Sequence, residues 1–562
     1  MPRKGRSGLC QDDTVTSFTR PEHLDALSQK SFDVVVIGAG MTGAGVAVDA
    51  AQRGLRVALI DAGDFACGTS SKSSKMVHGG LRYLQQKEFR LVYENLRERQ
   101  RLMKNAPHLV RILPFLIPLF GKDGVISSAV TKGYSAALRL YDLTGGWRIG
   151  KRYEQITKEQ TLSHLPTLHV DRLVAGFLYY DARGDDARVA LTLVQTATQK
   201  FGATAANYVR AIGVTHNDAG RVSAVHCRDE LTGQEFTITT ASVVNAAGVW
   251  ADSIFTMTER RESSRITPAK GVHVSVPHDK LPADVAAVFP VPGDRRSVFV
   301  VPFEEAGYTF VGTTDTAYDS DLSDPQVTPE DVEYLLRAIN GSTSITVTPE
   351  DITGVWAGLR PLLASEEGAS VSERTADLSR RHKVINSHDG VIHITGGKWT
   401  TYREMAEDSV DALCQELQLR KKCGTRALKL YGAPSSLTAQ ATPFDQHLAD
   451  RYGTVMSEIT SLIAEFPELA NCPIATLPYC DAEFLYAAQF EMSTSLVDLL
   501  TRRTRAHLMN APATLEAAAH IAAVVAGAQG WDAAEQAAQV ANYRALVTHE
   551  FTSAGLTLKG NS

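Results

Sequence analysis

One short segment limits the possible folds of this chain more than any other: a run of β-formers, Phe32-Asp-Val-Val-Val-Ile37, enters Gly38-x-Gly40-x-x-Gly43. The run predicts a buried strand, and Ala44 to Arg53 predicts a helix after the glycines. A second buried strand follows at Arg56-Val-Ala-Leu-Ile60 and ends at Asp61. Because a helix joins two parallel strands in this order, the segment predicts a sheet of the α/β class.

The three glycines predict a site for a dinucleotide. Gly38 permits a tight turn, Gly40 lets a pyrophosphate approach the backbone, and Gly43 lets the helix pack on the sheet. The anion is then expected at the helix N-terminus, where unpaired N–H groups and the helix dipole favour negative charge. Asp61 is expected to accept hydrogen bonds from the adenosine ribose. Asp61 by itself does not distinguish an NAD-binding site from an FAD-binding site.

The residues after Asp61 favour FAD. Thr69-Ser-Ser-Lys-Ser-Ser-Lys75 is rich in hydroxyls for a second phosphate face, and His78-Gly-Gly80 lets the backbone pass close to a flat ring. The chain then enters a long charged helix instead of the further βα units typical of a nicotinamide fold. A serine-rich surface loop is the alternative. The cofactor candidates here are Thr69, Ser70, Ser71, Ser74, His78, Gly79 and Gly80.

Later segments predict how the rest of the chain is organised. Residues 241–248 and 391–397 are expected to return to the first sheet, whereas 272–276, 297–301 and 308–313 favour antiparallel strands of an inserted cap. The predicted FAD-binding parts are about 31–105, 175–260 and 355–430, and the cap parts are about 106–174 and 261–354. Alanine-rich helical segments at 482–491, 514–529 and 532–549 predict a helical domain over 431–562. Residues 1–30 are expected to form a disordered leader.

Composition excludes several classes of protein. The formal charge is 57 − 63 = −6, which provides no general field for nucleic acid. Seven cysteines without C-x-x-C spacing predict reduced thiols and no metal site. The apolar run Ile112–Phe120 contains two prolines and is far shorter than the roughly 20 residues of a membrane-spanning helix. These features favour a cytoplasmic protein, and contact with the inner face of the cell membrane stays open.

Seven segments spread over most of the chain carry a resemblance to a known family: Thr69–Tyr83, Phe89–Val92, Ala106–Leu109, Gly312–Asp315, Gly358–Leu362, Gly396–Arg403 and Arg502–Arg505. Together they resemble the FAD-dependent (aerobic, respiratory) glycerol-3-phosphate dehydrogenase family. The resemblance implies a glutathione-reductase-like FAD-binding Rossmann domain with an antiparallel β-sheet cap, followed by an all-helical C-terminal domain. It also implies oxidation of sn-glycerol 3-phosphate to dihydroxyacetone phosphate, with electrons passed to a quinone. Asp61 departs from the family's usual Glu, and Trp399 stands where a smaller apolar residue is common.

A phosphorylated polyol needs cationic donors around its phosphate, and arginine binds phosphate through a planar fork. In the matching segments the resemblance implies substrate contacts by Arg82, Arg360, Arg374 and Lys398, with Tyr83 as a hydroxyl donor. A single arginine is more often part of a surface ion pair. Further FAD contacts are expected at Val209, Gly248, Gly397, Lys398 and Thr400.

His273 is the candidate base, because a neutral imidazole can take the C2 hydroxyl proton as hydride leaves that carbon. His78 is its rival, and a purely structural histidine is the alternative to both. Arg360 is also expected to polarise the developing carbonyl. Lys398 precedes a predicted helix and is expected to stabilise negative charge on the flavin.

Other functions and contacts stay open. If the chain is an oxidase, the electron acceptor is O₂ instead of a quinone. Two further alternatives are a noncatalytic flavin-binding module and an amino-acid oxidase. Residues 126–143 carry Lys132, Arg139 and aromatic side chains, which fits either a lipid surface or an ordinary amphipathic helix. The C-terminal helices are expected to serve packing and a homodimer contact. We interpret Arg502-Arg-Thr-Arg505 as a solvated face.

Overall fold

The computed structural model describes residues 18–81, 83, 88–121, 128–259, 266–294, 296–303, 306–363, 381–387 and 389–558. Its centre is a six-stranded sheet in the order β19-β20-β12-β2-β3-β8, parallel except for the edge strand β19. The predicted return of two later segments is confirmed, because Val243 pairs with both Val35 and Val391. The strands are β2 (Val34–Ile37), β3 (Val57–Ile60), β8 (Thr204–Ala206), β12 (Val243–Asn245), β19 (His382–Asn386) and β20 (Val391–Gly396).

Both faces of this sheet are covered, which explains why β2 and β3 are continuously apolar and fully buried. Helices α2 (Met41–Gln52), α7 (Asp186–Gln195) and α10 (Tyr402–Glu416) pack together on one face. A four-stranded sheet in the order β1-β11-β10-β9 shares the core of the other face with α8 (Ala251–Glu259). Its strands are β1 (Ser31–Phe32), β9 (Val209–His216), β10 (Val222–Asp229) and β11 (Glu235–Thr240).

The expectation of a disordered leader over residues 1–30 is wrong for its described part. Helix α1 (Arg20–Gln29) packs on β8 and β11 and buries Leu27 completely. Arg20 holds its start by pairing with Asp229 at 2.6 Å and by donating to backbone carbonyls. Polar residues dominate the helix, so its sequence alone gives no clear apolar stripe. Residues 1–17 lie outside the described part.

The predicted cap is confirmed as a largely antiparallel sheet, of ten strands, with β5 and β14 as a parallel pair. Two long strands, β7 and β18, extend it into ranges expected to bind FAD, so the cap is larger than 106–174 plus 261–354. The strands are β4 (Met76–Val77), β5 (Val110–Phe120), β6 (Glu154–Ile156), β7 (Leu173–Gly184), β13 (Ile266–Pro277), β14 (Ala286–Pro290), β15 (Ser297–Phe303), β16 (Tyr308–Gly312), β17 (Thr316–Ala317) and β18 (Gly354–Leu363).

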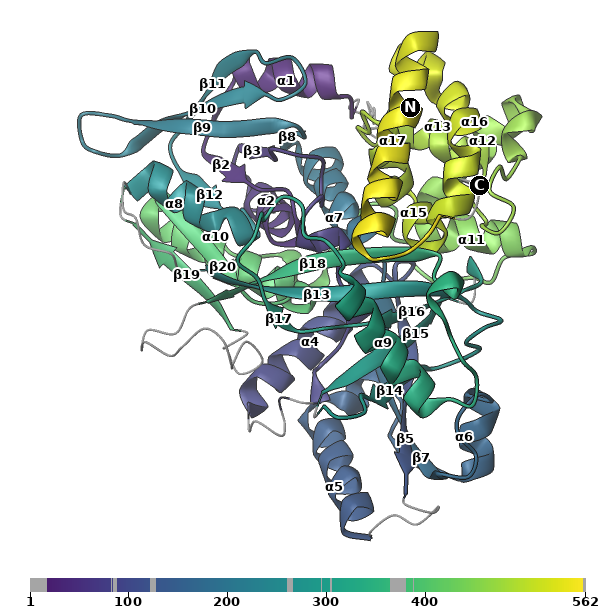
Figure 1. Ribbon diagram of the computed structural model, residues 1–562. Coiled ribbons are helices and arrows are strands. Elements are labelled where there is room, and N and C mark those ends of the chain that lie inside the picture. Colours follow the sequence, from purple (N-terminus) through teal and green to yellow (C-terminus); the bar gives the residue numbers. More distant parts are fainter. Residues whose placement is uncertain are drawn as a thin grey trace, which may run out of the picture.

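Among the described residues, the helices that accompany the cap are α4 (Phe89–Asn105), α5 (Ser128–Thr144), α6 (Lys158–His164) and α9 (Pro329–Ser342). Helix α5 lies at the extremity of the molecule farthest from α1, at the bottom of the view in Figure 1. Since α4 contacts both α5 and the turn before α10, it connects this extremity with the FAD-binding part.

The C-terminal helical segments are confirmed, and they share one core with the cap sheet. Figure 1 shows them beside β13 and β18, where Ser275 donates a hydrogen bond to Leu508 O. Helix α16 is apolar and long enough to cross a membrane by length and composition, yet it packs against α13 and α17. The helices are α11 (Pro443–Tyr452), α12 (Met456–Glu465), α13 (Asp481–Phe490), α14 (Leu496–Asp498), α15 (Ala506–Met509), α16 (Ala511–Gln529) and α17 (Ala533–Ser553).

The interpretation of Arg502–Arg505 as a solvated face is wrong. Arg503 and Arg505 are buried, and Arg502 is nearly so. Arg502 and Arg503 both bind Asp64, at 2.6 and 2.7 Å, and Arg505 binds Asp186 at 3.0 Å. These guanidinium groups therefore fix the helical domain to the loop that follows β3 and to the start of α7.

Candidate active site

A cavity of about 1470 Å³ lies between the six-stranded sheet and the cap. Most of the residues that we expect to contact cofactor or substrate line this cavity. They come from both the FAD-binding part and the cap. Those lining residues are Gly38, Gly40, Asp61, Thr69, Ser70, Ser74, His78, Gly80, Tyr83, Val209, Gly248, His273, Arg360, Gly397, Lys398 and Thr400. Arg82 and Arg374 lie outside the described residues.

The glycine turn forms a close-packed cradle at the start of α2. Gly38 has φ +103°, and a Cβ there would lie 2.6 Å from Ala246 O. A Cβ on Gly43 would lie 1.7 Å from Gly38 O, so the approach of helix to turn requires glycine. Ser70 Oγ accepts a hydrogen bond from Met41 N at 2.8 Å, which brings the hydroxyl-rich loop to the helix N-terminus. The cradle fits a pyrophosphate, because backbone N–H groups, dipole and hydroxyls converge there.

Asp61 stands at the end of β3, as predicted, and already holds the turn. Its Oδ2 accepts from Ala39 N at 2.7 Å and its Oδ1 accepts from Gly63 N at 3.0 Å. Burial raises the pKa of this carboxyl to about 6, against the lowering effect of those two backbone donors. A carboxylate oxygen accepts more than one hydrogen bond, so the ribose contact stays a prediction.

Gly43, Ser71 and Gly79 are absent from the cavity lining. Ser71 donates to Gly68 O at 3.3 Å and is buried behind the loop. Gly79 N donates to Tyr141 Oη at 2.9 Å and to Asp181 Oδ1 at 3.2 Å, and Asn95 donates to Gly79 O. These residues hold the walls of the cavity in position. No sequence motif indicates this network, because its members come from separate elements of the cap.

His273 lies on β13 with its imidazole in the cavity wall. Its Nε2 is 2.8 Å from Ser74 Oγ, and its ring stacks on Trp356 at 4.9 Å. Its Nδ1 is buried and has no hydrogen-bond partner among the described residues. Burial, followed by the charges of Lys75 and Arg360, holds the pKa of His273 well below its usual 6.5. The imidazole is therefore neutral near pH 7.

Arg360 lies on β18, which pairs with β13. A Cβ on Gly271 would lie 2.4 Å from Arg360 Nη2, so the guanidinium covers that glycine. Since side chains alternate along a strand, Gly271 and His273 share one face of β13. The guanidinium donates to Thr313 Oγ1 at 3.0 Å and Thr314 O at 3.2 Å and pairs with Asp315 at 3.3 Å. It is thereby fixed beside the imidazole.

Lys398 and Tyr83 form a second polar group in the cavity. Lys398 Nζ lies 3.6 Å from the centre of the Tyr83 ring. Lys398 directly precedes the short helical turn Trp399–Thr401, which leads into α10. A Cβ on Gly80 would lie 2.3 Å from the Tyr83 ring, so glycine is needed for this contact. The ammonium group of Lys398 and the start of the helical turn after it therefore both favour negative charge at this part of the cavity wall.

The sequence reasoning assigned no role to Lys75, which lies behind His273. Its Nζ is 3.1 Å from Asp186 and 5.2 Å from the centre of the Trp356 ring. Burial and the neighbouring Arg505 lower the pKa of Lys75 to about 8. Its position in a polar loop did not signal burial.

Within the described residues there is no cluster of three His, Cys, Asp or Glu side chains arranged for a metal ion.

Together the Rossmann sheet, the phosphate cradle and the cap-lined cavity define an FAD-dependent oxidoreductase. The family model for FAD-dependent oxidoreductases matches residues 33–403, and that for the C-terminal domain of alpha-glycerophosphate oxidase matches residues 392–536. The chain is 40% identical over 543 residues to glycerol-3-phosphate dehydrogenase 2 of Mycobacterium tuberculosis, covering 94% of this chain and 90% of that protein. It belongs to the FAD-dependent glycerol-3-phosphate dehydrogenase family.

More distant relatives agree with this assignment. The chain is 33% identical to the mitochondrial glycerol-3-phosphate dehydrogenase of Homo sapiens, covering 92% of this chain and 73% of that protein. The structure of the glycerol-3-phosphate dehydrogenase from Bacillus halodurans complexed with FAD matches with a TM-score of 0.76 and 30% identity, over 94% of this chain and 97% of that one. L-alpha-glycerophosphate oxidase from Mycoplasma pneumoniae, at 18% identity and a TM-score of 0.53, shares the fold.

Proposed function

We propose that this chain oxidises sn-glycerol 3-phosphate to dihydroxyacetone phosphate and passes the electrons to a quinone. One observation carries the proposal: a fixed guanidinium, Arg360, and a neutral imidazole, His273, stand side by side in the cavity that contains the dinucleotide cradle. This pair offers an anion-binding group next to a proton acceptor, which is what a phosphorylated alcohol requires.

Arg360 binds the substrate phosphate. Its donors already point along the Thr313–Asp315 segment, so little side-chain freedom is lost when an anion arrives. Lys398 adds a second positive charge to the cavity lining. Tyr83 contributes a hydroxyl beside that ammonium group.

His273 accepts the hydroxyl proton from the substrate. An imidazolium here is disfavoured by burial and by two neighbouring cations. The bound phosphate offsets the charge of Arg360 and so makes protonation of His273 less costly. Proton acceptance is thus coupled to the presence of the phosphorylated substrate.

FAD supplies the hydride acceptor for this chemistry when it is bound. Gly38, Gly40 and Ser70 would hold its pyrophosphate and Asp61 its ribose. His78, Gly80, Gly397 and Thr400 would lie near its ring system, and Val209 and Gly248 line the same cavity.

Anaerobic titration of the FAD-loaded protein tests the substrate. We expect glycerol 3-phosphate to bleach the flavin absorbance, because its phosphate meets Arg360 and its hydroxyl meets His273. Glycerol, which lacks the phosphate, is the matched control and should bleach far more slowly. Bleaching by an amino acid instead would identify an amino-acid oxidase, and bleaching by neither class would identify a noncatalytic flavin module. Either result contradicts the proposal.

An apolar wall of the cavity supports a quinone as the acceptor. Beside His78 the cavity is lined by Ile117, Tyr134, Tyr179, Val288 and Phe299. Such a surface suits a quinone ring, whereas O₂ needs no apolar wall of this extent. Reduction of a short-chain quinone, measured against peroxide formation under air, separates the two acceptors. Peroxide as the main product would establish the oxidase alternative.

An exposed apolar patch supports peripheral contact of this chain with the inner face of the cell membrane. The patch consists of Phe89, Tyr93, Leu140, Leu143 and Trp147, of which Leu143 is 79% and Trp147 59% exposed. Arg148 lies over the rings of Tyr93 and Trp147, at 5.1 and 5.5 Å. Exposed apolar and aromatic side chains with interleaved cations suit an anionic lipid surface. The homodimer contact of the C-terminal helices stays a prediction.

Replacement of Leu143 and Trp147 by aspartate should lower binding to anionic vesicles by about tenfold or more, since each buried side chain contributes on the order of 1.5–3 kcal/mol. Vesicle co-sedimentation measures the effect. Leu437→Asp is the control, because this leucine is 60% exposed in the linker after α10, away from the patch. Equal binding of the double variant and the control would remove the patch from membrane contact.

A further inference from the structure

No sequence motif indicated Arg296, yet it lines the cavity that also contains His273 and Arg360. It directly precedes β15 of the cap, and its side chain is 38% exposed. An arginine in the wall of such a cavity either binds the substrate itself or holds a residue that does. The hydrogen bonds of its guanidinium distinguish these two roles.

The guanidinium of Arg296 is anchored on the cap by Asp294 and Tyr334. Its Nε and Nη2 both donate to Asp294 Oδ2, at 2.8 and 2.6 Å. The Tyr334 hydroxyl, from α9, donates to the same oxygen at 3.2 Å, and the guanidinium lies 5.0 Å from the centre of the tyrosine ring. The hydrogen bond with Arg296 lowers the pKa of Asp294 to about 2 and raises the pKa of Arg296. Both groups are therefore charged near pH 7.

The third nitrogen of this guanidinium contacts residues 313–315, the segment that fixes Arg360. Nη1 of Arg296 donates to Asp315 O at 3.0 Å. Asp315 in turn pairs with Arg360 at 3.3 Å, and Arg360 donates to Thr314 O at 3.2 Å. Because Nε, Nη1 and Nη2 of Arg296 each have an acceptor within the protein, an anchoring role fits this residue better than direct binding of a phosphate.

Segment 313–315 depends on such contacts for its position. It lies between the end of β16 and the start of β17, so the hydrogen-bond ladder of the cap sheet does not continue through it. Val272 N donates to Thr314 Oγ1 at 3.1 Å and ties the middle of the segment to β13. Arg296 ties its last residue, Asp315, to the start of β15.

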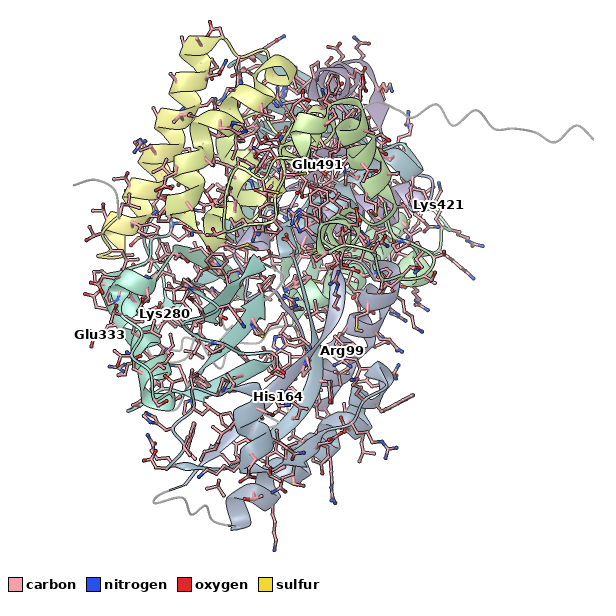
Figure 2. The ribbon with its side chains drawn as sticks, turned by 90° about the vertical axis from the view of Figure 1, so that its right-hand side faces the viewer. Arg99, His164, Lys280, Glu333, Lys421 and Glu491 are labelled. Carbon is pink, nitrogen blue, oxygen red and sulfur yellow. The ribbon has the colours of Figure 1, made fainter. Side chains whose placement is uncertain are left out.

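Helix α9 brings Tyr334 to this anchor from the surface of the molecule. Figure 2 shows the preceding residue, Glu333, at the outer edge of the cap, whereas Tyr334 is partly buried. Arg337, also on α9, lies over the same tyrosine ring at 5.6 Å. Two arginines therefore share one ring, and of these two Arg296 alone belongs to the cavity lining given by the described residues.

We propose that Arg296 is a positioning residue that sets the specificity for a phosphorylated substrate, because it holds segment 313–315 where that segment fixes Arg360. The inference rests on the proposed function, in which Arg360 binds the substrate phosphate. Without Arg296, Asp315 would be free to withdraw, and the Arg360 guanidinium would lose its fixed direction. A phosphate ester would then bind at a greater loss of side-chain freedom, whereas an alcohol without a phosphate would be affected much less.

Arg296→Gln tests this role in the FAD-loaded protein, through anaerobic flavin reduction by glycerol 3-phosphate and by glycerol. We expect the ratio of kcat/KM for glycerol 3-phosphate to that for glycerol to fall by about tenfold or more. Most of the change should be a higher KM for glycerol 3-phosphate, because His273 and the cofactor cradle keep their contacts. A general structural defect would slow both substrates alike and would leave the ratio unchanged.

Three further variants make the result specific. Arg296→Lys should restore only part of the ratio, since an ammonium group lacks the planar fork that holds Asp294 and Asp315 O together. Tyr334→Phe keeps the ring and removes one donor to Asp294, so it should cause a smaller fall. Arg337→Gln is the matched control, because it also removes a guanidinium from the Tyr334 ring, and it should leave the ratio unchanged.

An unchanged ratio in Arg296→Gln, or an equal fall in Arg337→Gln, would overturn the proposal. The wild-type protein separates these results from a failure of the proposed function. If glycerol 3-phosphate did not reduce the wild-type flavin, the proposed function would be wrong and the role of Arg296 in it would be wrong as well. Normal reduction of the wild type, with an unchanged ratio in Arg296→Gln, would overturn the role of Arg296 alone.

Discussion

His273→Ala is expected to slow flavin reduction by glycerol 3-phosphate by about 10²–10⁴-fold, the usual contribution of a positioned general base. Substrate affinity should change little, because the phosphate is bound by Arg360 and not by the imidazole. Anaerobic stopped-flow absorbance gives the reduction rate, and a titration gives the affinity. The flavin content of the variant must match the wild type, since His273 also packs on Trp356.

Other histidines serve as comparisons for this variant. His226→Ala removes a partly exposed imidazole that contacts Thr215 and Thr237 on β9 and β11, and should leave the rate unchanged. His78→Ala examines the rival base in the same cavity. An unchanged rate in His273→Ala, together with a slow His78→Ala, would transfer the role of base to His78.

The pH profile provides a second readout for His273. Its lowered pKa means that the base stays neutral as the pH falls through 6.5, so kcat/KM should show no inflection from this group there. An inflection near 6.5 that vanished in His273→Ala would show that the imidazole titrates normally and that its surroundings do not hold it neutral.

Arg360→Ala should lower kcat/KM for glycerol 3-phosphate by about 10²–10³-fold while the protein keeps its FAD. The expected loss falls on both KM and kcat, because the guanidinium binds the phosphate and polarises the developing carbonyl. Steady-state kinetics measures the change. Added guanidinium ion should restore part of the activity, which a merely structural defect would not allow.

Two further variants make the Arg360 result specific. Arg360→Lys should recover only part of the activity, since an ammonium group lacks the planar fork that holds Thr313 and Asp315 together with an anion. Arg221→Ala is the control, because Arg221 pairs with Glu416 at 2.7 Å, apart from the cavity lining. Full turnover in Arg360→Ala would exclude this residue from phosphate binding.

The first βαβ unit was predictable from the sequence because its causes are local. Three glycines within six residues, preceded and followed by buried strands, need no distant partner to define the turn. The antiparallel cap and the C-terminal helices were likewise visible as periodic patterns. Local patterns also brought two site residues forward, His273 from its place at a predicted cap strand and Arg360 through its matching segment.

Contacts between distant segments explain what the sequence reasoning missed. Arg502–Arg505 has the composition of a surface, yet Asp64 and Asp186, more than 300 positions away, bury these cations. Helix α1 is polar, and the ion pair between Arg20 and Asp229 holds its start in place. In each case the aspartate lies far along the chain from the arginine it binds, so no local pattern indicates the pair.

The sequence alone therefore indicated the cofactor class and the order of the domains, because glycine geometry and periodic patterns act over a few residues. The kind of substrate followed from the resemblance to a known family. Only the tertiary structure decided which charges are buried and which side chains meet. It put the neutral imidazole beside the guanidinium and buried Arg503 and Arg505 against the carboxylates of Asp64 and Asp186. The physical reason is that burial and pairing depend on segments that folding brings together from far apart along the chain.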